Sequence, residues 1–106
     1  MNIQKKTVTQ IDIFDAPNLD PIRVHIDDIA PGQGRITISC FSRAWACAAY
    51  WGSMSGRTIG QFFIDCDPGY LADSLAWGQR LKKHEEAYLI RIIEAVQAAL
   101  REEASA

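Results

Sequence analysis

Three stretches near the N-terminus alternate between apolar and polar residues. They run from Thr7 to Ile13, from Pro21 to Asp28 and from Gly34 to Phe41. Period-two alternation with many β-branched residues is typical of strands that bury one face. The segments between them contain the turn-favouring residues Pro, Gly, Asp and Asn. Because short turns join antiparallel neighbours, the pattern predicts a three-stranded antiparallel sheet.

The spacing of apolar residues becomes helical after these strands. Small and aromatic residues recur at helical spacing from Ala44 to Trp51, which predicts a helix over this range. Ser42 is its expected N-cap, and Gly52 stands just beyond its C-terminus. On such a helix Trp51 shares a face with small residues, and we expect it in the core.

Two short helices are expected next. Thr58 is placed to cap a helix from Ile59 to Cys66, although Gly60 weakens it. Asp67 followed by Pro68 is an N-cap with proline at the first helical position, and this second helix stops at Gly78. Its expected apolar positions are Tyr70, Leu71, Leu75 and, as a further candidate, Trp77.

The C-terminal helix is the longest predicted element and spans about Lys83 to Glu103. Tyr88 and Ile90 widen its apolar stripe beyond what one sheet face needs, which predicts a homodimer through two-fold pairing of this helix. Strands followed by helices predict a single α+β domain over residues 1–106, with three to four helices covering one face of the sheet.

Composition narrows the class of protein. The chain of 106 residues is 48% hydrophobic and 23% charged, as in globular domains. It has no apolar run that spans a bilayer and no signal peptide, so we expect a cytoplasmic protein with no membrane partner. Cys40, Cys47 and Cys66 form no CxxC pair, which favours buried thiols. We expect no cofactor and no bound metal.

Motifs for catalysis are incomplete. His84-Glu85-Glu86 begins like a zinc protease motif, but Tyr88 stands where the second histidine is needed. A small enzyme would need His25 or His84 to meet a cysteine or aspartate in space, and this is the least supported hypothesis. The loop from Gly52 to Thr58 departs from a nucleotide-binding loop in glycine spacing and in having Arg57 for lysine. It is either a weak anion site or a flexible interhelical loop.

Charge is unevenly distributed although the net charge is only −2. No acidic residue occurs between Ile29 and Ile64, and a second basic group follows later in the chain. These basic residues support nucleic-acid binding as the alternative function. They are Arg35, Arg43, Arg57, Arg80, Lys82 and Lys83.

The aromatic residues before the glycine-serine loop suggest a contact surface. Trp45 and Trp51 are six residues apart, so on a helix their directions differ by about 120 degrees and one of them lies outside the core. Aromatic and arginine residues at a boundary are typical interface anchors. The alternative is a peripheral aromatic group that covers Phe62 and Phe63. The expected contact residues are Trp45, Tyr50, Arg43, Arg57, Ser53 and Ser55.

The stretch from Cys40 to Leu75 resembles small accessory proteins of temperate phages and prophages of enteric bacteria. The resemblance is carried by Ala44-Trp45, Tyr50-Trp51-Gly52, Gly56-Arg57-Thr58-Ile59, Phe62-Phe63 and Asp67-x-x-Tyr70-Leu71. It transfers no catalytic residue and implies a phage accessory protein of the sort that binds a host protein. Our first hypothesis is a non-enzymatic protein-interaction module, a modulator or inhibitor of a host or phage protein. It rests on the incomplete catalytic motifs, the aromatic residues at the boundary and the wide apolar stripe of the last helix.

Overall fold

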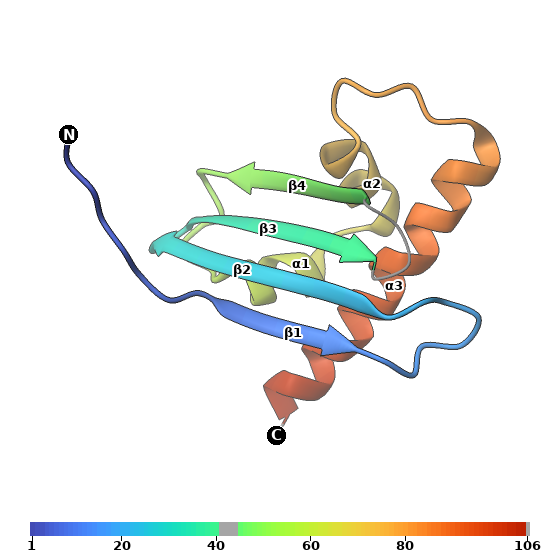
Figure 1. Cartoon of the computed structure of the whole chain (residues 1–106), viewed down its shortest axis with the longest axis horizontal. Coiled ribbons are helices and arrows are strands. Elements are labelled where there is room, and N and C mark those ends of the chain that lie inside the picture. The colour runs from blue at the N-terminus through green and yellow to red at the C-terminus, as the bar shows by residue number, and fades with distance from the viewer. Residues whose placement is uncertain (41–44, 106) are drawn as a thin grey trace.

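In the part of the chain that the structure describes, four antiparallel strands form a meander in the order β1-β2-β3-β4, and three helices cover one face of it (Figure 1). The structure is a computed structural model that describes residues 1–40 and 45–105, with Trp45 described by its backbone only. The strands are β1 (Thr9–Ile13), β2 (Ile22–Ala30), β3 (Gln33–Cys40) and β4 (Trp45–Trp51). The helices are α1 (Ile59–Asp65), α2 (Pro68–Leu75) and α3 (Lys83–Ser105).

The fold is α+β, but the predicted three-stranded sheet with three to four helices is wrong. Within the segment expected to be a helix from Ala44 to Trp51, the described residues Trp45–Trp51 form β4, which pairs with β3 so that Cys47 lies opposite Ile38. Cys47 is buried in the core while Ala46 and Ala48 are exposed, which is the period-two pattern of a strand. Short runs of alanine and aromatic residues fit both periods, and here the open edge of β3 decides between them. The expected N-cap, Ser42, lies outside the described residues.

The other predicted elements are confirmed with small changes at their ends. β1, β2 and β3 occupy the three alternating stretches, and α1, α2 and α3 follow in the expected order. Thr58 caps α1 in a reciprocal capping box with Gln61. Asp67 accepts hydrogen bonds from the backbone N–H groups of Gly69 and Tyr70 at the start of α2. Local capping chemistry thus set these helix starts as the sequence predicted.

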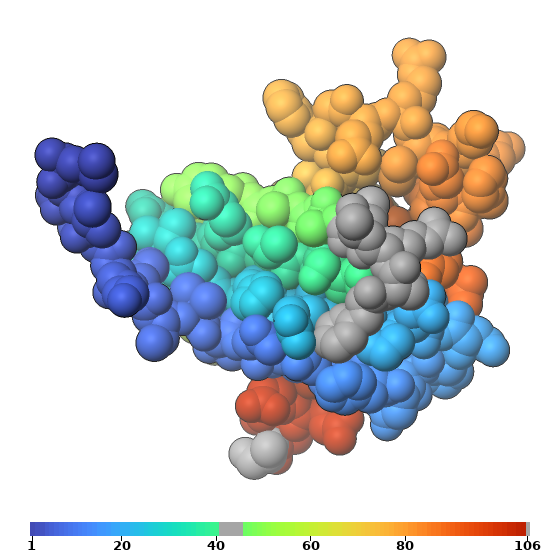
Figure 2. All heavy atoms as spheres, viewed as in Figure 1, coloured from blue at the N-terminus to red at the C-terminus, as the bar shows by residue number. Residues whose placement is uncertain are grey.

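The core lies between the inner face of the sheet and the helices. Isoleucine and valine side chains from β2 and β3 meet those of α3, which runs behind the strands in Figure 1. The opposite face of the sheet carries polar and small residues, and Figure 2 shows this uncovered face. Fully buried members of the core include Ile22, Val24, Ile36, Ile38, Phe63, Leu71, Ile92, Ile93 and Val96.

Gln97 is a polar side chain inside this apolar contact, and it is only 4% exposed. Its Nε2 donates hydrogen bonds to the carbonyl oxygens of Phe63 at 3.0 Å and of Cys66 at 2.8 Å. Carbonyl groups in the last turn of a helix have no partner within the helix. Gln97 therefore satisfies the C-terminal end of α1 and ties it to α3.

Replacing Gln97 with methionine keeps the volume of the side chain and removes both donors. We expect Gln97→Met to lower the free energy of unfolding by about 2 kcal/mol, because one buried and one partly buried carbonyl group lose their partner. Urea denaturation measures this change. Glu94→Met, on the exposed side of the same helix, is the control and is expected to change stability by less than about 0.5 kcal/mol. Equal effects of the two substitutions would contradict the role assigned to Gln97.

Candidate interaction surface

The loop between α2 and α3, residues 76–82, projects from the body of the protein (Figure 2). Its start is ordered by backbone hydrogen bonds from Ala76 N to Ala72 O at 2.9 Å, from Trp77 N to Ser74 O at 3.4 Å and from Gln79 N to Ala76 O at 2.8 Å. Gly78 then adopts a φ of +80°, a left-handed conformation that favours glycine. This turn presents Trp77 outward, and its side chain is 85% exposed.

Trp77 is the most exposed aromatic residue that the structure describes. The sequence pattern predicts it as a candidate apolar position of the second helix, but α2 ends at Leu75 and Trp77 follows in the turn. A large apolar side chain left in water on a monomer is a common mark of a binding surface. The sequence signal for this position was the adjoining Gly78, which predicts that the helix ends close to Trp77.

Three cations follow Trp77. Arg80, Lys82 and Lys83 are exposed, and within residues 1–40 and 45–105 none of them forms an ion pair or a side-chain hydrogen bond. The nearby carboxylate of Glu85 instead accepts a hydrogen bond from the backbone N–H of Lys82 at 2.9 Å, at the start of α3. The three positive charges are therefore available to a binding partner.

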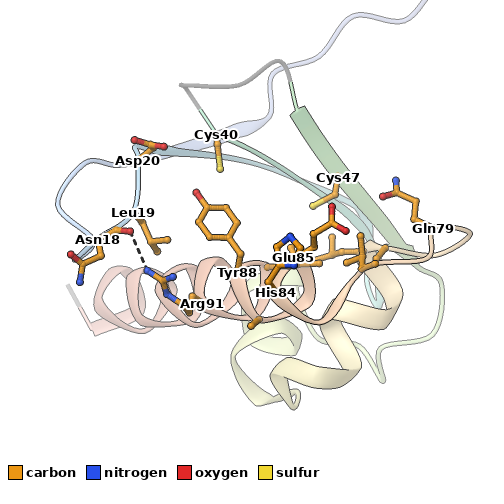
Figure 3. Close-up of a pocket in the computed structure, with 15 residues that line it drawn as sticks. Asn18, Leu19, Asp20, Cys40, Cys47, Gln79, His84, Glu85, Tyr88 and Arg91 are labelled. Atoms are coloured by element: carbon orange, nitrogen blue, oxygen red, sulfur yellow. Dashed lines mark hydrogen bonds between the residues drawn. The ribbon is translucent and has the colours of Figure 1, made fainter.

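A cavity of about 920 Å³ lies beside this loop (Figure 3). It separates the N-terminal half of α3 from one end of the sheet, and Leu75, Ala76, Gln79 and Leu81 connect its wall to the loop. Tyr88 points from α3 toward Cys40 across it. Other lining residues are Asn18, Leu19, Asp20, Cys47, His84, Glu85, Ala87, Leu89 and Arg91.

Arg91 fixes one end of the cavity. Its guanidinium donates a hydrogen bond to the backbone oxygen of Asn18 at 3.1 Å and lies 5.8 Å from the centre of the Tyr88 ring. This contact joins the β1–β2 loop to α3 (Figure 3). The cavity is thus bounded by a tethered loop at one end and by the α2–α3 loop at the other.

The cavity also brings together side chains that could carry chemistry. His84 lines it with the thiols of Cys40 and Cys47, which point into it from the sheet (Figure 3). Burial raises the pKa of Cys47 to about 12, and the nearby Cys40 adds to the rise. A nucleophilic cysteine needs the opposite shift. Among the described residues His84 makes no hydrogen bond to either thiol. The raised pKa therefore favours an inert Cys47 thiol.

The raised pKa predicts slow labelling and a pH-dependent stability. Native Cys47 should react with a thiol reagent at pH 8 far more slowly than in urea, and more slowly than the half-buried Cys66. The unfolded thiol ionises near its ordinary value of 9.0 and the folded one near 12. Its stabilising contribution is therefore complete below pH 9 and is lost as the pH rises toward 12.

Peptide mapping after pulse labelling measures the rates, and urea denaturation against pH measures the stability. Cys47→Ala is the control, because it removes this titration and leaves those of lysine and tyrosine in place. The expected result is a steeper alkaline loss of stability in the parent protein than in Cys47→Ala. Rapid labelling of native Cys47 at pH 8 would contradict the assignment.

Tyr50 and Arg57, two of the residues expected to form the contact surface, have separate partners. Tyr50 is 51% exposed on the uncovered sheet face, with the Arg35 guanidinium 5.9 Å from its ring centre. Arg57 forms an ion pair with Asp65 of α1 at 3.6 Å. No described contact joins Tyr50 to Arg57. Arg43 and the side chain of Trp45 lie outside the described residues, and the backbone of Trp45 pairs with Cys40.

The glycine-serine loop connects β4 to α1, so it is not an interhelical loop. Met54 is buried, and its N–H donates to the carbonyl of Gly32 at 2.9 Å. Ser53 and Ser55 are exposed on either side of it. Met54 therefore anchors the loop to the β2–β3 turn.

Trp51 was expected in the core, and it packs against the core without being fully buried. Trp51 is half-buried, with its ring centre 5.2 Å from that of Phe62, and its Nε1 donates to the Tyr70 hydroxyl at 3.0 Å.

Tyr88 and Ile90, the residues expected at a dimer face, are also half-buried and pack against the core. Dimerisation through these two residues stays a prediction.

Most charges on the uncovered sheet face are paired. Arg23 bonds to Asp12 at 2.9 Å, and this contact lowers the pKa of the Asp12 carboxyl. Lys6 pairs with Asp27 at 2.8 Å, and His25 shares a hydrogen bond with Gln10 at 2.9 Å. This face therefore does not present a strong field of one sign.

Comparison with known proteins connects the chain to phages. The model of the phage family Phage_phiTE_072 matches residues 1–82. No curated protein matches the chain. No solved structure matches it. None of the described helices is both long and apolar enough to cross a membrane.

Proposed function

This chain belongs to the phage family Phage_phiTE_072, and we propose that it is a non-enzymatic protein-interaction module that modulates a host protein. The match confirms the resemblance to phage proteins. The binding surface in this proposal is the α2–α3 loop, with Trp77 as its anchor, and the site of action is the host cytoplasm.

The observation that carries the proposal is the 85% exposure of the Trp77 side chain. Exposed tryptophan costs solubility and contributes little to the core, whereas tryptophan is enriched among residues that dominate binding energy at protein interfaces. Next to Trp77 stand Arg80, Lys82 and Lys83, whose charges have no partner in the described protein. An acidic surface with an apolar pocket fits this combination.

Contact with a macromolecule also fits the chemistry beside the loop better than catalysis does. The thiols that face His84 are buried, and the high pKa of Cys47 opposes formation of a thiolate. Groups of three or more metal-binding side chains are absent from the described residues. The cavity then supplies an apolar wall behind the loop, which a partner side chain can contact.

Site-specific crosslinking tests the proposal. A photoreactive phenylalanine derivative at position 77 should crosslink one host protein in infected cells, and the same derivative at position 3 should not. Ile3 is 78% exposed in the N-terminal segment, far from the α2–α3 loop in Figure 1. The crosslinked protein is then purified, and its affinity for the chain is measured by calorimetry.

Trp77→Ala should weaken this binding at least tenfold, because truncation of an interface tryptophan commonly costs more than about 1.4 kcal/mol. Ile3→Ala should leave the affinity unchanged. Thermal unfolding should be unaffected by either substitution, since both side chains are exposed. Wild-type affinity of Trp77→Ala, or equal crosslinking from positions 77 and 3, would contradict the proposal.

Nucleic-acid binding is the second candidate function, and the unpaired cations favour it. Exposed Trp77 next to Arg80, Lys82 and Lys83 resembles a stacking residue beside phosphate-binding side chains. On this hypothesis a labelled single-stranded DNA should bind at low salt and quench the tryptophan fluorescence.

Replacing all three cations with alanine tests this second function. The slope of log affinity against log salt should become shallower by roughly 2, since each lost phosphate contact contributes about 0.7 on single strands. Lys5→Ala, in the N-terminal segment, is the control. Absence of binding at low salt would remove the hypothesis.

A further inference from the structure

The outer edge of β4 has backbone hydrogen-bonding groups without a partner among the described residues. Strand order places β4 at the end of the sheet, and within the described residues its backbone pairs with β3 alone. Figure 1 shows no strand on its other side. An edge of this kind is a template for another strand.

The sequence of β4 leaves this edge unprotected. Its seven residues, WACAAYW, contain no charge and no proline. Proteins usually guard exposed edges with charged residues, proline, bulges or short strands. The opposite edge follows that rule, because β1 has only five residues and carries Asp12 paired to Arg23. The contrast indicates that β4 is an edge used for pairing.

The side chains of β4 complement a second copy of the same strand. In an antiparallel pairing centred on Ala48, the large Tyr50 of one copy lies opposite the small Ala46 of the other. Both residues are on the uncovered face, where Ala46, Ala48 and Tyr50 are exposed. With no charge on the strand, two copies meet without like-charge repulsion, which would cost stability in directly opposite pairs.

The helix layer next to β4 extends the contact. Tyr70 of α2 is 48% exposed and accepts a hydrogen bond from Trp51 at the end of β4. α2 packs against β4 and lies behind it in Figure 1. Two-fold symmetry across the strand pair brings the helix layers of both copies to the same side of the joined sheet.

We infer that a second copy of this chain pairs with β4, so that two four-stranded sheets form one continuous antiparallel sheet. The dimer is held by backbone hydrogen bonds between the two β4 strands and by the Tyr50–Ala46 contacts. It does not depend on the α2–α3 loop, so its failure and the failure of the proposed function are separable.

Opposite charges at the symmetry centre test the inference. Sedimentation equilibrium of the wild-type chain should give a dimer at micromolar concentration. Ala48→Lys and Ala48→Glu each place like charges opposite each other, and each alone should weaken dimerisation at least tenfold. An equimolar mixture of the two should recover dimers of mixed composition, because the charges then attract.

Control variants separate this effect from general changes in charge. Ala98→Lys and Ala98→Glu alter an exposed position on α3 by the same charge and should dimerise like wild type. Circular dichroism reports whether each variant is folded, and Ala48 is exposed on the uncovered face, away from the core. Hydrogen exchange of the wild-type chain supplies a test without substitutions. Protection of β4 amides should increase with protein concentration.

Three results would overturn the inference. The first is a monomeric wild-type chain at high concentration. The second is a dimer that both Ala48 variants leave intact, as a pairing through Tyr88 and Ile90 of α3 would produce. The third is protection of β4 amides that does not change with concentration.

Discussion

Burial of isoleucine and valine between the sheet and α3 holds the domain together. Ile36 and Ile38 of β3 and Ile92 and Ile93 of α3 are fully buried, and removing each such side chain from water contributes about 1.5–3 kcal/mol. Close packing ends near the N-terminal half of α3, where the helix and the end of the sheet enclose a cavity. The α2–α3 loop borders this cavity. The position of the candidate surface therefore depends on how far the close packing between α3 and the sheet extends.

The α2–α3 loop and the edge of β4 share one physical property, which is that the fold leaves some of their groups without a contact inside the described part of the protein. Trp77 presents a large apolar area to water. Among the described residues, the cations after it form no ion pair and the outer edge of β4 has no backbone partner. By contrast, the charges on the uncovered sheet face are mostly paired, and the buried polar side chain of Gln97 has two partners. Groups satisfied within the chain stabilise it, while unsatisfied ones are available for contacts outside it.

Local patterns predicted most of the secondary structure. Alternation in the first three strands and the caps at Thr58 and Asp67 are properties of neighbouring residues, and these elements appear where the sequence predicted them. The helix predicted from Ala44 to Trp51 was wrong over the described residues Trp45–Trp51, because their alanine and aromatic residues satisfy a helical and a strand period equally. That error also separated the expected contact residues, because a strand sends Tyr50 to the uncovered face, while Arg57 follows in the next loop and pairs with α1.

Apolar periodicity and capping residues therefore sufficed for the α+β class, the first three strands and the three helices, since each depends on contacts within a few positions of the chain. The fourth strand required the open edge of β3, which exists only once the meander has formed. The exposure of Trp77 and the cavity beside it depend on where α3 lies against the sheet. Such long-range packing leaves no periodic trace in the sequence, so the location of the candidate surface became visible only in three dimensions.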